Sequence, residues 1–237
     1  KLMTETGFQS IDVKLEIDYP DLWWPNGLGD QKLYKIDCSL IHNDYGVQTI
    51  SRKVGLRTIE LIQEKDSLGK SFYFKVNGLP VFMKGANYIP MQILGNDVDT
   101  NRYERLINDA AESNMNMLSV WGGGIYEHDI FYDLCDEKGL LVWQDFMFAN
   151  GMYPADSLML SSIQTEAGEQ IKRLRNHPSI ALFCGNNEIA EAWANWGWKN
   201  KHSIEQQKKM EKDYSQIFHE QLPDMVSQLS PHISYWP

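Results

Sequence analysis

The chain has 237 residues, of which 43% are hydrophobic and 23% charged, a composition typical of a folded, soluble protein with one large domain or two ordinary ones. Its formal charge of −10, without a run of lysines or arginines, disfavours a nucleic-acid partner. No apolar stretch approaches the ~20 residues that cross a bilayer, so no membrane association is expected. The compartment is left open between a bacterial periplasm and cytoplasm.

The first part of the chain alternates apolar and polar residues. In "IDVKLEIDYP", Ile11, Val13, Leu15 and Ile17 fall on one face of a strand, and charged residues fall on the other. The stretches "KLYKIDCSLIH" and "VQTISRKVGLRTIEL" continue this pattern between turn-rich segments. Residues 11 to 60 therefore predict part of an antiparallel β-sandwich. Because a typical sandwich has ~100 residues, further strands are expected upstream.

From Phe72 onward, predicted strands alternate with predicted helices. The stretch "FYFKVNGLPVFMKGANYIP" predicts a hairpin around Asn77 and Gly78 that leads into a strand. Further strands are expected at "MNMLSVW", "LLVWQDF", "SIALFCG" and "HISYW". The helix in "HDIFYDLCDEKG" is expected to end at Gly139, a natural left-handed cap. Helical spacing is kept by three further apolar sets, which are Tyr103, Leu106, Ile107, Ala110 and Ala111; Ile163, Ala167, Ile171 and Leu174; and Ile204, Tyr214, Ile217 and Phe218.

This alternation, with near-continuous apolar strands, predicts a parallel sheet covered by helices. An open doubly wound sheet and a (β/α)8 barrel both fit the pattern. Four strand-helix units and the start of a fifth strand occupy about 165 residues, against eight units in ~250 residues of a complete barrel. If the sheet is a barrel, the chain is expected to contain about half of it.

Polar or glycine-rich residues directly follow each predicted strand. They are Asn87, then Trp121 with three glycines, then Gln144 with Asp145, then Asn186, Asn187 and Glu188. In either α/β architecture, ligands bind at this carboxyl edge of the sheet, so we expect the four segments to converge on one site. The glycines of "WGGGIYEHD" lack the spacing of a phosphate-binding loop. We expect them to form a tight turn that brings Trp121 and backbone to a neutral ligand.

Glu188 is the strongest candidate for chemistry, although an acidic residue at this position can also cap the helix that follows it. Asn187 can bind a hydroxyl group, and Trp193, Trp196 and Trp198 are expected to form an apolar wall of the kind that keeps a carboxyl group protonated. Glycoside hydrolysis normally needs a second carboxyl group. Asp145 is the other strong acid at this edge, and a role as hydroxyl ligand or scaffold residue fits it better than that of a nucleophile. The partner of Glu188 is then expected beyond Pro237.

Other kinds of site are not indicated. Cys38, Cys135 and Cys184 are widely separated, so neither a zinc site nor a disulfide framework is expected. No serine lies in a GxSxG elbow, and the histidines have no metal-ligand spacing. Neither a metal nor another cofactor is therefore predicted. His177, which precedes Pro178, is expected to be a buried structural residue.

Five ordered motifs resemble those of the β-mannosidases of glycoside hydrolase family 2. They are "LWWPNGLGDQKLY", "VGLRTIEL", "FKVNGLPVFMKGANYIP", "NMNMLSVWGGGIYEHDIFYDLCDEKGLLVWQDFMFA" and "NHPSIALFCGNNEIAEAW". The resemblance implies the C-terminal part of an immunoglobulin-like β-sandwich at residues 1–62. It also implies the N-terminal half of a catalytic (β/α)8 TIM barrel at residues 63–237. The implied activity is the removal of terminal β-linked mannose with retained configuration.

The resemblance also implies roles for particular residues. Glu188 is similar to the family's acid/base, and Asn187 to the asparagine that binds near the sugar's 2-hydroxyl. Trp121 and Trp196 are similar to walls of the mannose subsite, Asp145 lies where the family keeps a carboxylate, and Asn87 is expected to contact the substrate. The nucleophilic glutamate belongs to a later strand. The expected partner is a carbohydrate, either a β-mannoside or a mannan-derived oligosaccharide.

One position departs from the family pattern. Most relatives read "LRVWGGG", where the arginine lies under the site and keeps the nucleophile ionised, whereas this chain has Ser119. Arg57, in "GLR", matches the pattern, with a structural role at least as well supported as a catalytic one.

Two alternative functions stay open. One is another family 2 glycosidase, acting on β-galactosides, β-glucuronides or glucosaminides. The other is a carbohydrate-binding relative without turnover. This chain by itself is expected to be inactive.

Overall fold

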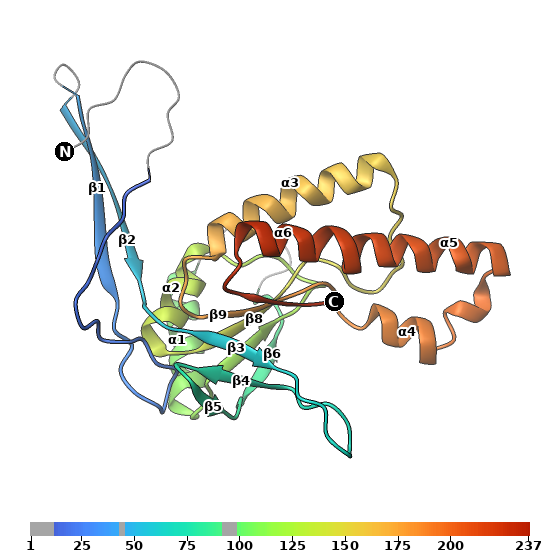
Figure 1. Ribbon diagram of the computed structural model, residues 1–237, viewed down its shortest axis with the longest axis horizontal. Helices are drawn as coiled ribbons and strands as arrows, with labels where there is room; N and C mark the ends of the chain where they lie inside the picture. Colours follow the sequence, from blue (N-terminus) through green and yellow to red (C-terminus); the bar gives the residue numbers. More distant parts are fainter. Residues whose placement is uncertain (1–11, 43–45, 92–98) are drawn as a thin grey trace.

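The computed structural model describes residues 12–42, 46–91 and 99–237 (Figure 1). These residues form two small antiparallel sheets followed by a five-stranded parallel sheet with helices between its strands. No helix within the described ranges is long and apolar enough to cross a membrane.

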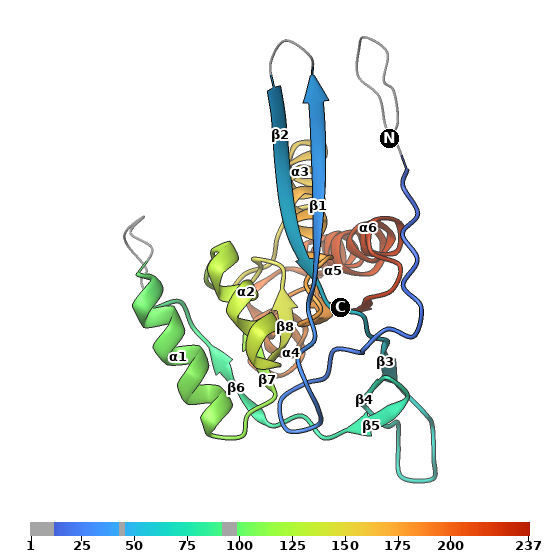
Figure 2. The same cartoon turned by 90° about the vertical axis from the view of Figure 1, so that its left-hand side faces the viewer.

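The first antiparallel sheet is a long hairpin of β1 (Tyr34–His42) and β2 (Gly46–Val54), paired from Tyr34 with Val54 to His42 with Gly46. The hairpin extends away from the parallel sheet in both views (Figures 1 and 2). Large apolar side chains on it are about 60% exposed, among them Leu40 and Ile50. The prediction of strands for these two stretches is confirmed.

The strand predicted at residues 11 to 18 is wrong where the structure describes it. Residues 12 to 17 are in no strand, and Val13, Leu15 and Ile17 are all exposed; Ile11 lies outside the described residues. Alternation identifies a buried face only if a neighbouring strand accepts the backbone hydrogen bonds and a second layer covers that face. No described strand pairs with this segment.

The second antiparallel sheet contains β3 (Ile59–Ile62), β4 (Tyr73–Val76) and β5 (Leu79–Val81). The predicted turn at Asn77 and Gly78 is confirmed, and both residues have positive φ, 50° and 80°, as a two-residue hairpin turn requires. Strands β3 and β4 pair across the expected domain boundary between residues 62 and 63. The division into domains at that boundary stays a prediction.

The parallel sheet has the strand order β10-β9-β8-β7-β6. Its strands are β6 (Gly85–Tyr88), β7 (Met117–Val120), β8 (Leu141–Asp145), β9 (Ile180–Cys184) and β10 (Ser234–Trp236). The strands lie beside one another in chain order and the order never reverses. A doubly wound sheet reverses its order at a switch point, so this segment is singly wound.

The connections between the strands are mainly helical. The helices are α1 (Thr100–Glu112), α2 (Asp129–Lys138), α3 (Ser157–Leu174), α4 (Ile189–Asn195), the 3-10 helix η1 (Lys199–Lys201), α5 (Ile204–Ser215), the π-helix η2 (Gln216–Gln221) and α6 (Leu222–Leu229). Helix α1 packs against α2, and α3 packs against α6. The predicted left-handed cap of α2 is confirmed, because Gly139 has φ 73°.

The core lies between the parallel sheet and these helices. All residues of β9 are buried, which explains its continuous apolar run. The stripe predicted on α3 is confirmed, because Ile163, Ala167, Ile171 and Leu174 are buried. On the last long helix, Ile217 and Phe218 are buried as predicted, but Ile204 is 72% exposed. The prediction for Ile204 is wrong because it is the first residue of α5, and that end of the helix extends past the sheet (Figure 1).

The "WWPNG" segment docks on the C-terminal ends of α1 and α2. Trp23 is fully buried, and its indole N–H donates to the carbonyl of Asp136 at 2.7 Å. The Asn26 side chain donates to the carbonyls of Ala111 and Met115 at 2.8 and 2.9 Å. The Asn26 backbone N–H donates to the carbonyl of Gly139 at 2.8 Å. The bond from Trp23 satisfies a carbonyl in the last turn of α2, and the bonds from Asn26 tie the segment to the loops that follow both helices.

Arg57 has a structural role. Its guanidinium donates to the carbonyls of Pro178 and Ile180 at 3.0 and 2.7 Å, so it joins the β2–β3 connection to the start of β9. Burial lowers the pKa of this guanidinium to about 10, a value at which it stays charged at neutral pH. Its contacts lie at the opposite end of β9 from Glu188.

Candidate active site

A pocket of about 400 Å³ lies at the carboxyl ends of β8, β9 and β10. It brings together three of the predicted site residues, Asp145, Asn187 and Glu188, together with Ser119. The other lining residues are Trp143, Cys184, Asn186, Ala190, Glu191, Tyr214, Trp236 and Pro237. As expected for a parallel sheet, segments distant in the sequence converge at this edge.

Glu188 lies between β9 and α4 with its side chain exposed and lining the pocket. Its backbone is left-handed, with φ 58° and ψ 12°, an uncommon conformation for a residue with a Cβ atom. It occupies the N-cap position of α4, yet its carboxylate makes no capping hydrogen bond. The carboxylate instead accepts a bond from the Asn187 side chain at 3.3 Å. Side-chain capping, the structural alternative for this glutamate, is therefore wrong.

Asn187 is fixed through its backbone. Its N–H donates to the carbonyl of Phe148 at 2.9 Å, and Ala149 forms a parallel bridge with it. Because the backbone is held, the half-buried amide side chain is directed to the pocket beside Glu188. An amide in this place can bind a ligand hydroxyl as donor or acceptor.

Asp145 is 4% exposed and is held by several donors. The Gly122 backbone N–H donates to one oxygen at 2.9 Å, and the Trp143 indole N–H donates to the other at 3.0 Å. Burial raises the pKa of this carboxyl to about 6, against the opposite effect of these bonds and of the Cys184 thiol. With its oxygens engaged, Asp145 holds the loop after β7 in place, as its expected scaffold role requires.

The glycines after β7 allow the contact between Gly122 and Asp145. A Cβ atom on Gly122 would lie 2.7 Å from the Phe146 carbonyl oxygen and 2.8 Å from that of Phe148, so only glycine fits. Its N–H is used by Asp145 within the protein. The Trp121 ring lies over Gly123, where a Cβ would approach the ring to 2.2 Å. The expected tight turn is confirmed, but its Gly122 amide faces a protein carboxylate.

Three predicted site residues lie near this edge without lining the pocket. They are Asn87, whose strand neighbour is the pocket residue Ser119; Trp121; and Trp196, which is 52% exposed at the end of α4. Trp193, expected in the apolar wall, instead stacks on His202 and donates to Glu211 at 3.0 Å. It therefore packs within the α4–α5 segment and does not form a wall of the pocket.

Sequence reasoning missed several pocket residues. Trp143 shares a face of β8 with Asp145, two positions later, and this alternation could have identified it. Its ring contacts that of Phe72, at 5.7 Å between centroids, and Phe72 contacts Trp236 at 5.0 Å. Tyr214 comes from α5, and nothing in the local sequence relates it to β9. Burial raises the pKa of the Cys184 thiol to about 12, so this pocket residue is no nucleophile at neutral pH.

Replacing Asp145 with asparagine is expected to make the slope of the free energy of unfolding against pH more positive between about pH 4 and 6. The pKa of this carboxyl is raised from 3.8 to about 6 in the folded state. The folded state therefore binds more protons than the unfolded state in this window, and the free energy of unfolding falls as the pH rises. The shift corresponds to on the order of 3 kcal/mol. Urea unfolding of both proteins at several pH values measures the two slopes; equal slopes would contradict this expectation.

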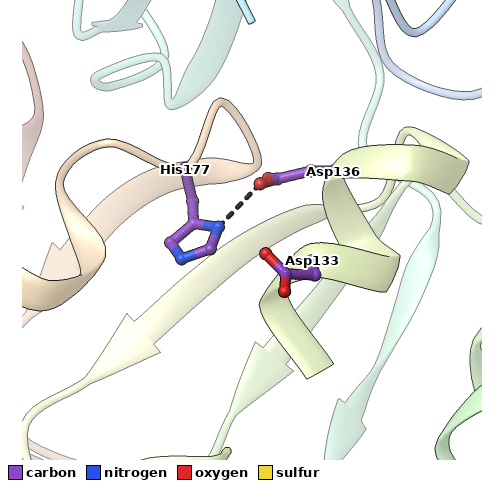
Figure 3. Close-up of side chains that lie close together, drawn as sticks. All are labelled: Asp133, Asp136 and His177. Carbon is purple, nitrogen blue, oxygen red and sulfur yellow. Dashed lines mark hydrogen bonds and ion pairs between the residues drawn. The ribbon is translucent and has the colours of Figure 1, made fainter. Parts of the chain in front are cut away.

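A second cluster, of Asp133, Asp136 and His177, lies at the other end of the sheet (Figure 3). Its ligand atoms lie within 4.8 Å of one another, close enough to hold a metal ion. Asp136 is buried and already accepts bonds, from His177 Nδ1 at 2.6 Å and from the Ser179 backbone N–H at 3.0 Å. These contacts join α2 to the start of β9, which gives His177 the structural role expected from the sequence. The absence of a metal stays a prediction.

Asp136→Ala is expected to lower the free energy of unfolding by about 3 kcal/mol. The substitution leaves the buried N–H of Ser179 and the ring of His177 without an acceptor, and each such group costs about 1–3 kcal/mol. Asp133→Ala is the matched control, because that aspartate is exposed on the same helix, and a change within about 0.5 kcal/mol is expected. Urea unfolding compares the two variants. Losses of equal size would show that the Asp136 contacts are not what joins α2 to β9.

Comparisons with known proteins find relatives of this chain in sequence and in structure. The sequence model of the glycosyl hydrolases family 2 matches residues 2–57. The chain is 42% identical over 230 residues to β-mannosidase B of Aspergillus oryzae, covering 95% of this chain and 27% of that protein. The crystal structure of the β-D-mannosidase from Dictyoglomus thermophilum superposes with a TM-score of 0.86 at 44% identity, over 94% of this chain and 27% of that one. β-Glucuronidase 3 of Bacteroides uniformis shares the fold, with a TM-score of 0.72 at 22% identity over 92% of this chain and 25% of that one.

The chain belongs to glycosyl hydrolase family 2. Within that family it is similar to β-mannosidases over nearly its whole length. It spans about a quarter of the length of the curated relatives it matches.

Proposed function

We propose that this chain is part of a retaining exo-β-mannosidase, in which Glu188 is the acid/base that cleaves terminal, non-reducing β-D-mannose from β-mannosides or mannan-derived oligosaccharides. The observation that carries the proposal is the environment of Glu188. Its carboxylate is exposed, makes no cap bond to α4 and lines a pocket with Asn187. The 42–44% identity to β-mannosidases supports the choice of sugar.

In the first step, Glu188 gives its proton to the glycosidic oxygen while a nucleophilic carboxylate bonds to the anomeric carbon and the bond to the leaving group breaks. In the second step, the Glu188 carboxylate takes a proton from water, which attacks the anomeric carbon, displaces the nucleophilic carboxylate and releases mannose. The exposed position allows both transfers, since the leaving group departs and water arrives at the same carboxylate. Asn187 is placed to bind a hydroxyl of the sugar beside it.

Retention needs a nucleophilic carboxylate ~5 to 5.5 Å from the acid/base. Asp145 is a poor candidate because it is buried and its oxygens accept bonds from Gly122 and Trp143. The match covers about a quarter of the relative's length, and we assign the nucleophile to a part of the full-length enzyme outside that quarter. We also propose, from the resemblance of the sequence motifs, that β6 to β10 belong to the first half of a (β/α)8 barrel. On the same ground, we propose that residues 1–62 belong to an immunoglobulin-like sandwich.

A panel of 4-nitrophenyl glycosides tests the proposed substrate in the enzyme of full length. The β-D-mannoside is expected to give the highest kcat/KM, above the β-galactoside, β-glucuronide and β-glucosaminide. The related glucuronidase structure supports the fold alone at 22% identity, so no observation here favours those sugars. Faster release from any of the three would overturn the assignment to mannose.

A specific observation favours one second candidate, a carbohydrate-binding protein without turnover. Ser119, which stands where most β-mannosidases have an arginine, lines the pocket together with Asp145 and Glu188. A serine cannot supply the positive charge that keeps a nearby nucleophile ionised. Titration calorimetry with mannose, done beside the glycoside assay, separates the candidates: binding without hydrolysis supports this second one.

A further inference from the structure

We propose that Asn186 and Tyr214 position Glu188 for proton transfer, by holding its backbone left-handed and by capping α4 in its place. The proposal rests on the proposed function of Glu188, and it adds two residues that act through Glu188. Both line the pocket, and they come from the end of β9 and from α5.

The starting observation is the strained backbone at Glu188. A left-handed conformation is disfavoured for residues other than glycine and persists where the surrounding structure fixes it. The residue also occupies the N-cap position, where a short polar side chain such as that of Ser, Thr, Asp or Asn ordinarily bonds to the helix N–H groups. Here it does not, and the carboxylate stays free to face the pocket. Some other group must therefore satisfy the start of α4.

Asn186 is that group. Its side-chain oxygen accepts the backbone N–H of Ile189, the first residue of α4, at 3.1 Å. Because a backbone N–H can only donate, its partner on Asn186 is the oxygen Oδ1. The amide nitrogen is then left to donate, and it does so to the Tyr214 hydroxyl at 3.2 Å. Asn186 is 8% exposed, so both bonds are largely shielded from water.

Tyr214 fixes the orientation of this amide. Its ring packs against Phe218 at 4.8 Å and His219 at 5.6 Å between centroids. Both of these partners belong to the π-helix η2, a rare helical form that often marks functional sites. Since the hydroxyl accepts from Asn186, its own proton remains available toward the pocket that it lines. Tyr214 therefore connects α5 to the loop that carries Glu188.

The segment before Glu188 is held on two further sides. The N–H of Gly185 donates to the carbonyl of Trp236 on β10 at 2.7 Å, and the N–H of Asn187 donates to that of Phe148. A Cβ atom on Gly185 would lie 2.4 Å from the Tyr235 hydroxyl, so the backbone packs closely against β10 and a side chain does not fit at this position. With these positions fixed, the Asn186 cap determines how the chain enters α4 and where the Glu188 carboxylate points.

The kinetic test uses the enzyme of full length and compares kcat/KM for phenyl β-D-mannoside with that for 2,4-dinitrophenyl β-D-mannoside. Phenol is a poor leaving group and needs the proton, whereas dinitrophenol does not. Asn186→Ala is expected to lower the phenyl value about tenfold more than the dinitrophenyl value, and Tyr214→Phe about threefold more. Asn200→Ala, at an exposed asparagine of η1 outside the pocket, is the control and should change neither value. An equal fall for both substrates in Asn186→Ala would overturn the proposal.

A crystal structure of the Asn186→Ala enzyme tests the positioning without relying on activity. Residue 188 is expected to leave the left-handed region, or its carboxylate to bond to the N–H groups of α4. Asn186→Asp keeps an acceptor for Ile189 and is expected to restore the original backbone. An unchanged Glu188 in the alanine variant would overturn the proposal. If the wild-type enzyme cleaves no glycoside, the proposed function fails, and the crystal structure still decides whether Asn186 holds Glu188.

Discussion

Replacing Gly139 with alanine is expected to lower the free energy of unfolding by about 3 kcal/mol. Gly139 has φ 73°, which costs a residue with a Cβ atom ~1 kcal/mol or more. The added Cβ would also lie 2.5 Å from the Asn26 backbone nitrogen. To relieve this overlap, Asn26 must move away from the carbonyls of Gly139, Ala111 and Met115, at a typical cost of ~1–3 kcal/mol. Denaturant unfolding of the chain measures the loss.

Gly27→Ala is the matched control for this substitution. Gly27 lies in the same docking segment and has a similar φ of 83°, but a Cβ atom there would meet nothing within 4 Å. The control should therefore cost ~1 kcal/mol, for the backbone conformation alone. The difference between the two variants isolates the contact of Asn26 with α1 and α2. Equal losses would show that this contact contributes little to stability.

Replacing Glu188 with glutamine is expected to lower kcat/KM for phenyl β-D-mannoside by about 10³-fold in the enzyme of full length, within the ~10²–10⁴-fold that general acid catalysis contributes. Glutamine has nearly the same shape and can bond to Asn187, but it has no proton to transfer. For 2,4-dinitrophenyl β-D-mannoside, the same ratio should fall less than about tenfold, since that leaving group departs without protonation. The ratio kcat/KM is chosen because it reports the first step, before water is needed.

Glu191→Gln is the control for Glu188→Gln. Glu191 is another carboxylate that lines the pocket, three positions after Glu188, and it accepts a bond from Asn195 at 2.9 Å. Its loss should affect the two substrates to the same extent. If Glu188→Gln also slowed both substrates equally, another carboxyl group would have to be the proton donor.

The parts of the fold that local interactions decide were predictable from the sequence. Gly139 ends α2, Asn77 and Gly78 form the hairpin turn, and the stripe on α3 is buried. Each of these follows from a backbone preference or from a repeat that the element itself generates. The predicted strand at residues 12 to 17 and the predicted burial of Ile204 failed, because a period indicates which side chains share a face and not whether another layer covers it.

The sequence predicted that the site lies at the carboxyl edge of the parallel sheet, but not how its residues are held. Strand ends converge in any parallel sheet, so Asp145, Asn187 and Glu188 were expected to lie together, and the pocket contains all three. The left-handed backbone of Glu188 and the cap supplied by Asn186 were not predictable, since tertiary contacts such as that from Tyr214, 28 positions away, determine them. Asp145 and Gly122 also bind each other across 23 positions, which neither motif indicates.

The most direct test of the role of Glu188 is a distance in a crystal structure of the Glu188→Gln enzyme of full length, with intact phenyl β-D-mannoside bound. We expect the side-chain amide of residue 188 to lie within ~3.2 Å of the glycosidic oxygen, the reach of a proton donor. A bound mannoside whose glycosidic oxygen lies beside another carboxyl group, with residue 188 directed away from it, would contradict the assignment.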